Sequence, residues 1–422
     1  MFFALAGFKH IFSPMGAQIF SNINLIAGTA NPLQALRGEE LARLETISNG
    51  YIIVEGDEIA EVGSMLDFKY NSSPVESGTI VMPAWCDSHT HLVFAESREE
   101  EFLLKLKGAS YAEISAKGGG ILNSAKKIGE YSEDKLFDLA WQRLQNIARM
   151  GTGAVEIKSG YGLSAEGELK MLRVIKKLKE KSRLEIKSTF LGAHAYPEAY
   201  RQDHETYIHS IIHEMLPIIA REGLADYIDV FCEVGFFSPD EMIRICNAGK
   251  NFGLKPRLHV NQLNSIGAIE AGLQLDAVSM DHLETVTQKD IELLGGFQGM
   301  STLLPTAAFF LRMNMPPARD LIAHNAAIAL ATDFNPGSSP SSNMNLVISM
   351  ACISMRMLPE EAVNAATING AFAMELAKNF GSIYPGKKAN LIFTKPVPSF
   401  AYLPYAFGDN LISRVMIKGE FI

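Results

Sequence analysis

The strongest constraint on the fold is a repeated alternation in the middle of the chain. Eight short apolar runs alternate with longer stretches whose apolar residues recur at helical spacing. Parallel strands joined by helices produce this pattern. Eight such repeats over about 250 residues predict an α/β protein with a closed, TIM-like (β/α)8 barrel. The predicted strands are residues 84–93, 154–159, 187–195, 227–233, 256–260, 277–283, 300–304 and 328–334.

An open, doubly wound sheet is the alternative for such an alternation. That fold binds dinucleotides or phosphates at a glycine-rich loop after the first strand, and no such loop follows residues 84–93. The GGG triplet at residues 118–120 lacks the Lys-Ser/Thr pair of a P-loop. The barrel is therefore the preferred interpretation.

The two ends of the chain carry short strand patterns without long helices. Residues 19–25, 51–54 and 59–62 are predicted strands near the start, and residues 389–394 and 414–422 near the end. We expect these ends to pair into one small β-sandwich domain. The predicted division is 1–81 for its first part, with residues 1–15 as a disordered tail, 82–380 for the barrel, and 381–422 for its second part.

Composition excludes two classes of partner. The 422 residues include 38 basic and 47 acidic side chains, a net charge of −9, and no basic block is longer than a pair. Nucleic-acid binding, which needs a basic face, is therefore not expected. The charge-free run at residues 293–311 contains polar residues, a proline and glycines, so no membrane span is expected there.

The cysteines and the start of the chain indicate a reducing compartment. The apolar stretch at residues 1–8 is too short for a secretory signal. The four cysteines are scattered, form no C-x-x-C pair, and are interpreted as buried apolar residues of a cytoplasmic protein. They are Cys86, Cys232, Cys246 and Cys352.

Histidines gather where the predicted strands end. The first run ends in His89-Thr90-His91, and residues two apart on a strand point to the same face. An H-x-H pair alone is a weak signal, because it occurs by chance. However, five of the ten histidines and one acid lie at predicted carboxyl ends, where barrel enzymes place their chemistry. These residues are His89, His91, His194, His259, His282 and Asp333.

Three imidazoles and one carboxylate suit a single divalent ion such as zinc or iron, with a position left for water. Such an ion lowers the pKa of its water toward about 7, so the pattern predicts hydrolysis. His209 and His213 have helical spacing but lack the glutamate of an H-E-x-x-H site, and are interpreted as an exposed helix face.

These ligand motifs resemble the metal-dependent amidohydrolase superfamily, and finer motifs resemble its imidazolonepropionase family. The resemblance covers essentially the whole chain after the first residues. The motifs are residues 88–94 (SHTHLVF), 118–122 (GGGIL), 158–163 (KSGYGL), 189–195 (TFLGAHA), 281–284 (DHLE) and 332–337 (TDFNPG).

The resemblance implies the roles of individual residues. His89, His91, His259 and Asp333 would be the metal ligands. Asp333, His282 and His194 would be catalytic. Arg98 would bind a substrate carboxylate; its alternative is a surface ion pair with a neighbouring glutamate. The further substrate-binding residues would be Tyr111, Tyr161, His194, Gln262, Asn335, Gly337 and Ser338.

Gln262 stands where parts of the family have a glutamate base, so a base role would pass to Asp333 or His282. Asn261 and Asn390 replace acids that are frequent in the family, and both are interpreted as structural.

The resemblance also implies an activity and an assembly. The expected reaction is hydrolysis of the ring amide bond of 4-imidazolone-5-propanoate to N-formimino-L-glutamate in histidine degradation, by a homodimer. Two alternatives remain: a deaminase of an amino-substituted heterocycle from the same superfamily, and a metal-free, non-catalytic barrel.

Overall fold

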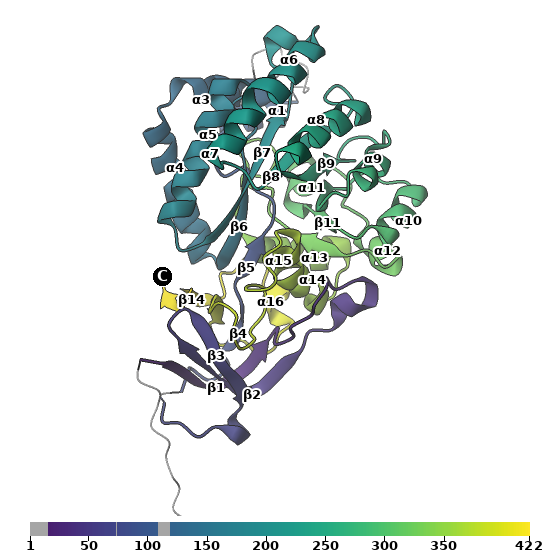
Figure 1. The fold of residues 1–422 in the computed structure, drawn as a ribbon. Helices are drawn as coiled ribbons and strands as arrows, with labels where there is room; N and C mark the ends of the chain where they lie inside the picture. The colour runs from purple at the N-terminus through teal and green to yellow at the C-terminus, as the bar shows by residue number, and fades with distance from the viewer. Residues whose placement is uncertain (1–15, 73, 109–118) are drawn as a thin grey trace, which may run out of the picture.

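The computed structural model describes residues 16–72, 74–108 and 119–422. The tail expected at residues 1–15 lies outside these ranges. The chain forms an eight-stranded sheet surrounded by helices and a seven-stranded sheet that lies below it in Figure 1.

The larger sheet contains all eight strands expected from the apolar runs. They follow one another in sequence order, and each is parallel to the next. The predicted (β/α)8 architecture is confirmed. The strands are β5 (Trp85–Asp87), β6 (Thr152–Lys158), β7 (Glu185–Ala193), β8 (Tyr227–Cys232), β9 (Lys255–Val260), β10 (Ser279–His282), β11 (Met300–Leu303) and β12 (Ile328–Leu330).

Contacts at the end of β5 and beyond the end of β12 bring the first and last strands together. The carboxylate of Asp87 accepts hydrogen bonds from the backbone N–H and the hydroxyl of Thr332, at 3.0 and 2.7 Å. One residue further on, the N–H of Asp333 donates to the carbonyl of His89 at 3.0 Å, and Thr90 bridges to Phe334. This seam therefore joins the segments that carry three of the predicted ligands.

The helices pack their apolar stripes on the outside of the barrel. Ser132 and Ser164 cap the two longest, α4 (Glu133–Arg149) and α5 (Ala165–Lys181), by accepting a backbone N–H of the first turn. No helix within the described ranges is long and apolar enough to cross a membrane. The other α-helices are α1 (Glu99–Leu106), α3 (Ile121–Glu130), α6 (His204–Ser210), α7 (Leu216–Glu222), α8 (Pro239–Asn251), α9 (Ala268–Gln274), α10 (Gln288–Gly296), α11 (Pro305–Leu311), α12 (Ala318–Ala323), α13 (Met344–Met355), α14 (Pro359–Ala366), α15 (Ile368–Ala373) and α16 (Tyr402–Tyr405).

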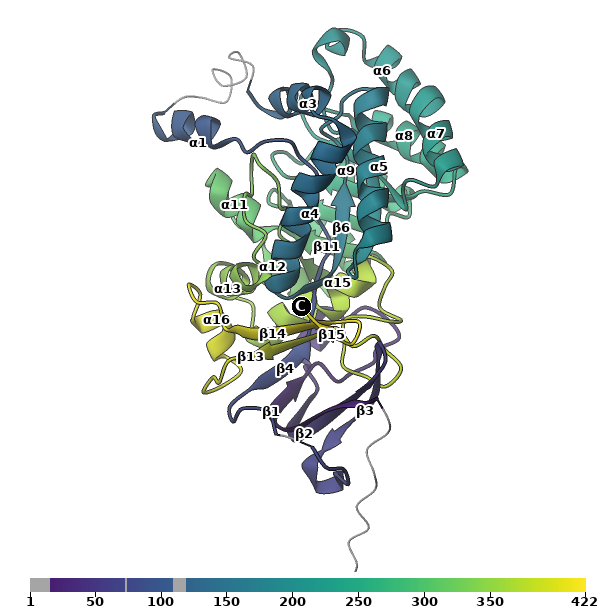
Figure 2. The same ribbon diagram turned by 90° about the vertical axis from the view of Figure 1, so that its left-hand side faces the viewer.

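The smaller sheet joins the two ends of the chain, as Figure 2 shows from the side. Its order is β15-β14-β13-β4-β1-β2-β3. A small core of its own, including Phe20, Ile52 and Phe393, stabilises it. The expected small β domain built from both ends is thus confirmed. The strands are β1 (Gln18–Ala27), β2 (Thr46–Glu55), β3 (Glu58–Ser64), β4 (Ile80–Pro83), β13 (Leu391–Thr394), β14 (Ile412–Ile417) and β15 (Glu420–Phe421).

Asn390 connects the two sheets. Its side-chain amide donates to the carbonyl of Gly153 in the barrel strand β6 and accepts from the N–H of Lys418 after β14, at 3.1 and 2.8 Å. These contacts agree with the structural role expected for this residue.

Candidate active site

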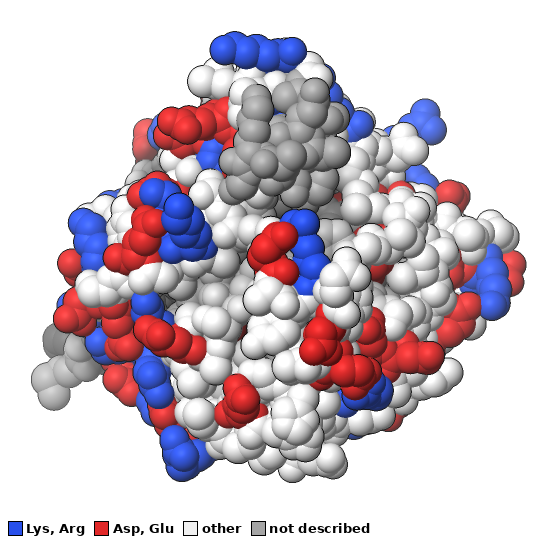
Figure 3. Space-filling model, turned by 90° about the horizontal axis from the view of Figure 1, so that it is seen from above, with Lys and Arg blue, Asp and Glu red and all other residues white. Residues whose placement is uncertain are grey.

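A cavity of about 510 Å³ opens at the carboxyl ends of the barrel strands. In the view from above in Figure 3, acidic and basic side chains are interspersed around this face. Every predicted site residue within the described ranges lines the cavity except His89, which is fully buried. Tyr111 falls outside those ranges. The lining includes His91, Arg98, Tyr161, His194, His259, Gln262, His282, Asp333, Asn335, Gly337 and Ser338.

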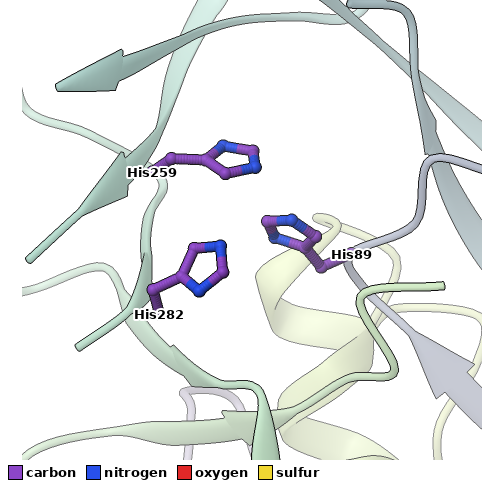
Figure 4. A group of neighbouring side chains, drawn as sticks. All are labelled: His89, His259 and His282. Carbon is purple, nitrogen blue, oxygen red and sulfur yellow. The ribbon is translucent and has the colours of Figure 1, made fainter. Parts of the chain in front are cut away.

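The histidines converge on one point at the bottom of this cavity. Figure 4 shows His89, from the segment after β5, pointing toward His259 of β9 and His282 of β10, and one ligand atom of each lies within 4.8 Å of the others. Nε2 of His259 is 3.4 Å from Nε2 of His91. Oδ1 of Asp333 is 3.5 Å from Nε2 of both His89 and His91. The strand ends thus gather four imidazoles and a carboxylate.

These separations fit a divalent ion. Ligand atoms about 2.1 Å from a tetrahedral zinc ion lie about 3.4 Å from one another. Among the described residues, Nε2 of His89 is buried without any hydrogen-bond partner, which an ion at the common point would provide. Two overlapping groups could hold it: His89, His259 and His282, and His89, His91 and Asp333.

Protonation favours the same interpretation. Burial, followed by the neighbouring positive charges, holds the pKa of His89, His91 and His259 well below the ordinary histidine value. The three rings are therefore neutral near pH 7 and offer lone pairs to a cation. Burial also raises the pKa of Asp333 to about 7, and a cation at this place would stabilise its ionised form.

Buried carboxylates orient two of these histidines. Nδ1 of His89 lies 2.7 Å from Asp281 Oδ2, and Nδ1 of His259 lies 2.9 Å from Asp229 Oδ2. Such hydrogen bonds turn the opposite nitrogen of each ring toward the metal position and strengthen it as a donor.

Two buried cations hold these carboxylates in turn. Nζ of Lys158 is 2.9 Å from Asp229 and 3.0 Å from Glu156, and Arg257 is 3.4 Å from Asp281; all of these side chains are fully buried. No pattern in the sequence predicts this network. The sequence gives only two hints of it. Asp281 directly precedes His282, and the other charged residues of the network interrupt apolar strands.

His282 differs from the other histidines in protonation. Burial lowers its pKa, but the charge and hydrogen bond of Glu284, 3.2 Å away, and the charge of Asp333 outweigh burial, so the pKa lies above the ordinary value. The backbone of His282 (φ 90°) and of Asp333 (φ 51°) lies in the left-handed region, a strain that concentrates at functional sites. His282 is therefore suited to donate a proton or hydrogen bond.

His194 and Tyr161 form one wall of the cavity. Nδ1 of His194 lies 2.9 Å from the carbonyl oxygen of Gly160 and can bond to it only as a donor, so Nε2 is left for a ligand. The ring stacks on His91 with centroids 5.2 Å apart. Burial lowers the pKa of His194 to about 4, so this ring is neutral as well.

Arg98 pairs with a neighbouring glutamate and also lines the cavity. Its Nε and Nη2 donate to the Glu101 carboxylate at 2.9 and 2.6 Å, so a neighbouring glutamate does pair with it. The pair is not a solvated surface contact, because the side chains are only 10% and 9% exposed and Arg98 lines the cavity. The guanidinium packs so closely on Gly337 that a Cβ there would lie 2.2 Å from Nη1.

The loop after β12 makes hydrogen bonds to Asp333. Asn335 donates from Nδ2 to the Asp333 carbonyl at 2.6 Å and accepts the N–H groups of Gly337 and Ser338. The Ser338 hydroxyl is 3.3 Å from Asp333 Oδ2. Gln262 reaches the opposite wall of the cavity, while Asn261 donates to the Thr285 carbonyl, as expected of a structural residue.

Other residues singled out in the sequence lie apart from the site. His209 and His213 are exposed, and their rings lie against each other in a tilted arrangement with centroids 4.3 Å apart, which fits the expected exposed helix face. The cysteines are unpaired, three of them buried and Cys352 partly so. The lining also includes residues that sequence analysis did not single out, among them Lys105, Phe231, Phe236 and Met313.

Comparisons with known proteins agree with this geometry. The model of the amidohydrolase family matches residues 80–422. An imidazolonepropionase from Flavobacterium johnsoniae is 54% identical over 92% of this chain and 96% of its own. Another from Clostridium tetani is 41% identical over 93% and 95% of the two chains.

Solved structures share the fold at low sequence identity. Guanine deaminase from E. coli has a TM-score of 0.71 at 13% identity and covers 96% of this chain and 98% of its own. A mutant atrazine chlorohydrolase from Arthrobacter aurescens, complexed with zinc and atraton, has a TM-score of 0.69 at 13% identity and covers 96% and 94%. From its full-length relatives and the family match, the chain belongs to the amidohydrolase family and, within it, to the imidazolonepropionases.

Proposed function

We propose that this chain opens the ring of 4-imidazolone-5-propanoate, hydrolysing the amide carbon–nitrogen bond to give N-formimino-L-glutamate. The observation that carries the proposal is one cavity with a histidine and aspartate cluster at one end and Arg98 at another. The substrate has the matching parts, a cyclic amide and a propanoate tail. The relatives named imidazolonepropionase support the same reaction.

We propose that His89, His91, His259 and Asp333 hold one divalent ion, zinc or iron, since imidazole and carboxylate ligands suit both. When bound, the ion would activate water and polarise the substrate carbonyl. The chain's own contribution begins with neutral imidazoles whose orientation the buried carboxylates fix.

Proton transfer is assigned to Asp333 and His282. Oδ2 of Asp333, which accepts from Ser338, would take a proton from the attacking water and return it to the ring nitrogen as the carbon–nitrogen bond breaks. His282, whose pKa Glu284 raises, would donate a hydrogen bond to the carbonyl oxygen as negative charge develops there. No proton is gained or lost overall by the protein.

Substrate orientation is assigned to the opposite walls. Nε2 of His194 would accept a ring N–H, because its Nδ1 is already bonded. The phenol of Tyr161 and the amide of Gln262 would contact the ring, and Arg98 the carboxylate, as a planar fork suits. Asn335, Gly337 and Ser338 would close the side beside Asp333. The role proposed for Tyr111, next to the tail, concerns a residue outside the described ranges.

The test is turnover by the fully metallated protein. Loss of the imidazolone ultraviolet absorbance together with formation of N-formimino-glutamate is the expected result. No turnover at full metal content would overturn the proposal. Release of ammonia from an amino-substituted heterocycle would favour a deaminase, and a metal content near zero after careful purification would favour a non-catalytic barrel.

We also propose that the protein acts as a homodimer in the cytoplasm. Exposed apolar side chains on α1 and α11, Phe102, Leu103, Leu106 and Phe309, support an association face. Light scattering of the purified chain at micromolar concentration tests the dimer; a monomer mass would contradict it.

A further inference from the structure

A buried carboxylate holds the loop that follows β6. Glu168 lies in the first turn of α5 and is fully buried. Its Oε2 accepts the backbone N–H of Gly160 at 3.0 Å, and its Oε1 accepts those of Gly162 and Leu163 at 2.7 and 3.0 Å. Three of the four backbone N–H groups of residues 160–163 therefore donate to one side chain.

Glu168 has no cationic partner among the residues that the structure describes, which sets it apart from the buried carboxylates near the metal position. Burial raises its pKa, and the hydrogen bonds from Ser159, Leu163, Gly162 and Gly160 oppose that rise. A carboxylate is costly to bury unless its oxygens are fully bonded. The backbone of the loop and the side chain of Ser159, rather than an ion pair, provide those bonds.

The loop packs directly against this helix turn and against His194. A Cβ at Gly162 would lie 2.2 Å from the backbone nitrogen of Glu168. At Gly160, where φ is +109°, a Cβ would lie 3.0 Å from Nδ1 of His194. Close approach therefore requires glycine at both positions, and a shift of the loop would be transmitted to the imidazole.

The loop reaches the cavity at two points. The carbonyl of Gly160 receives the Nδ1–H of His194 at 2.9 Å, and Tyr161, between the clamped residues, lines the cavity. The ring of Tyr161 lies 5.5 Å from that of His194 and 5.7 Å from that of His91. Glu168 itself does not line the cavity, so any effect on the site passes through the loop.

We propose that Glu168 is a positioning residue: its carboxylate fixes the backbone of residues 160–163 and, through the Gly160 carbonyl, holds His194 as the Nδ1–H tautomer with Tyr161 beside it. The kinetic consequence rests on the proposed function, whereas the tautomer does not. If the three hydrogen bonds to Glu168 are lost, the Gly160 carbonyl moves. Nε2 of His194 is then no longer held as the hydrogen-bond acceptor.

The kinetic test compares Glu168→Gln with Glu166→Gln in zinc-loaded protein. Glu166 is exposed in the same first turn of α5 and serves as the matched control. We expect Glu168→Gln to lower kcat/KM about 10- to 100-fold with unchanged zinc content, because misplacing a substrate-contacting group has effects of that size. Glu166→Gln should retain the wild-type value. Equal kinetics in both variants would overturn the proposal.

The structural test is the tautomer itself. In histidine-labelled, zinc-loaded protein, nitrogen NMR should show a single Nδ1–H tautomer for His194, assigned by loss of the signal in His194→Asn. Glu168→Gln should show a mixture of tautomers, and Glu166→Gln should not. An unchanged tautomer in Glu168→Gln would overturn the proposal even if thermal stability fell.

A double-mutant cycle separates positioning from a general loss of structure. If Glu168 acts through His194, adding Glu168→Gln to His194→Asn should lower kcat/KM by much less than it does alone, whereas additive losses would contradict the proposal. If Glu168→Gln does not fold, Glu168→Asp keeps the charge but is too short to reach all three N–H groups, and the same outcomes apply. A lack of ring-opening activity in the wild-type protein would overturn the proposed function. The NMR measurement of the His194 tautomer would still test whether Glu168 positions the loop.

Discussion

The two ends of the cavity are held in place in different ways. At the metal end, the histidines lie on or directly after barrel strands, and Lys158 and Arg257 fix the carboxylates that orient them. At the Arg98 end, the side chains lie on or next to loops, and side-chain acceptors hold these loops by bonding to their backbone N–H groups. Glu101, for example, accepts the N–H of Gly120. The comparison teaches that ion pairs inside the barrel fix the reacting centre, whereas loop contacts set which substrate fits.

Removing a ligand at the metal end should have the largest effect. We expect His259→Ala to lower metal content and to reduce turnover about 10³-fold or more, because a bound ion contributes several kcal/mol to the transition state. Metal analysis and the ring-opening assay measure both quantities. His213→Ala, at an exposed histidine, is the control. Full metal content and rate in His259→Ala would contradict its assignment as a ligand.

Removing the carboxylate behind that ligand should have a smaller effect. Asp229→Asn loses the charge that faces Nδ1 of His259 and Lys158. We expect the dissociation constant of the metal to rise about 10- to 100-fold, with part of the activity restored by excess metal. Asp134→Asn changes an exposed carboxylate and should leave the constant unaltered. Equal affinities for the two variants would mean that the buried network does not tune the site.

Arg98→Met should act on binding rather than on chemistry. A hydrogen bond to a charged group contributes about 1.5–3 kcal/mol, so KM should rise about 10- to 100-fold while kcat and metal content change little. Because the substitution leaves the Glu101 carboxylate buried and unpaired, Arg98→Met with Glu101→Gln is the matched control, and it should show the same rise in KM. An unchanged KM would leave Arg98 with only its structural pairing.

Gly337→Ala should have the smallest effect at the same end. Its Cβ would overlap the Arg98 guanidinium and displace it, so KM should rise several-fold without loss of metal. Gly296→Ala, where no atom lies within 4 Å of the added carbon, should leave KM unchanged in the same assay. A larger effect on kcat than on KM would mean that the glycine supports Asp333 rather than Arg98.

The barrel and the convergence of ligands could be predicted from sequence because both follow from periodic patterns. Alternating apolar runs identify strands, and parallel strands bring their carboxyl ends to one edge. His194, His259 and His282 therefore needed only their positions in the pattern to be placed together. The small β domain followed in the same way from strand patterns at both ends.

The supports of the site could not be predicted, because they depend on pairs that only folding creates. Lys158 and Asp229 are 71 positions apart, and nothing in either segment marks the other as its partner. In the sequence, Glu168 resembles any acid in the first turn of a helix. Only the folded loop shows that it accepts three backbone N–H groups. For Arg98 the sequence also allowed an ion pair with a neighbouring glutamate. The structure contains this pair, because Arg98 bonds to Glu101 and also faces the cavity.

The seam between β5 and β12 has a consequence for how the protein matures. Asp87 and Thr332, which form it, are 245 positions apart, and three of the proposed metal ligands, His89, His91 and Asp333, follow shortly after them in the sequence. A partly synthesised chain therefore cannot assemble the complete ligand set, and an ion that binds the finished set adds its binding energy to closure of the cylinder. The complete metal site should thus form late in folding, only after the last barrel strand has joined the first.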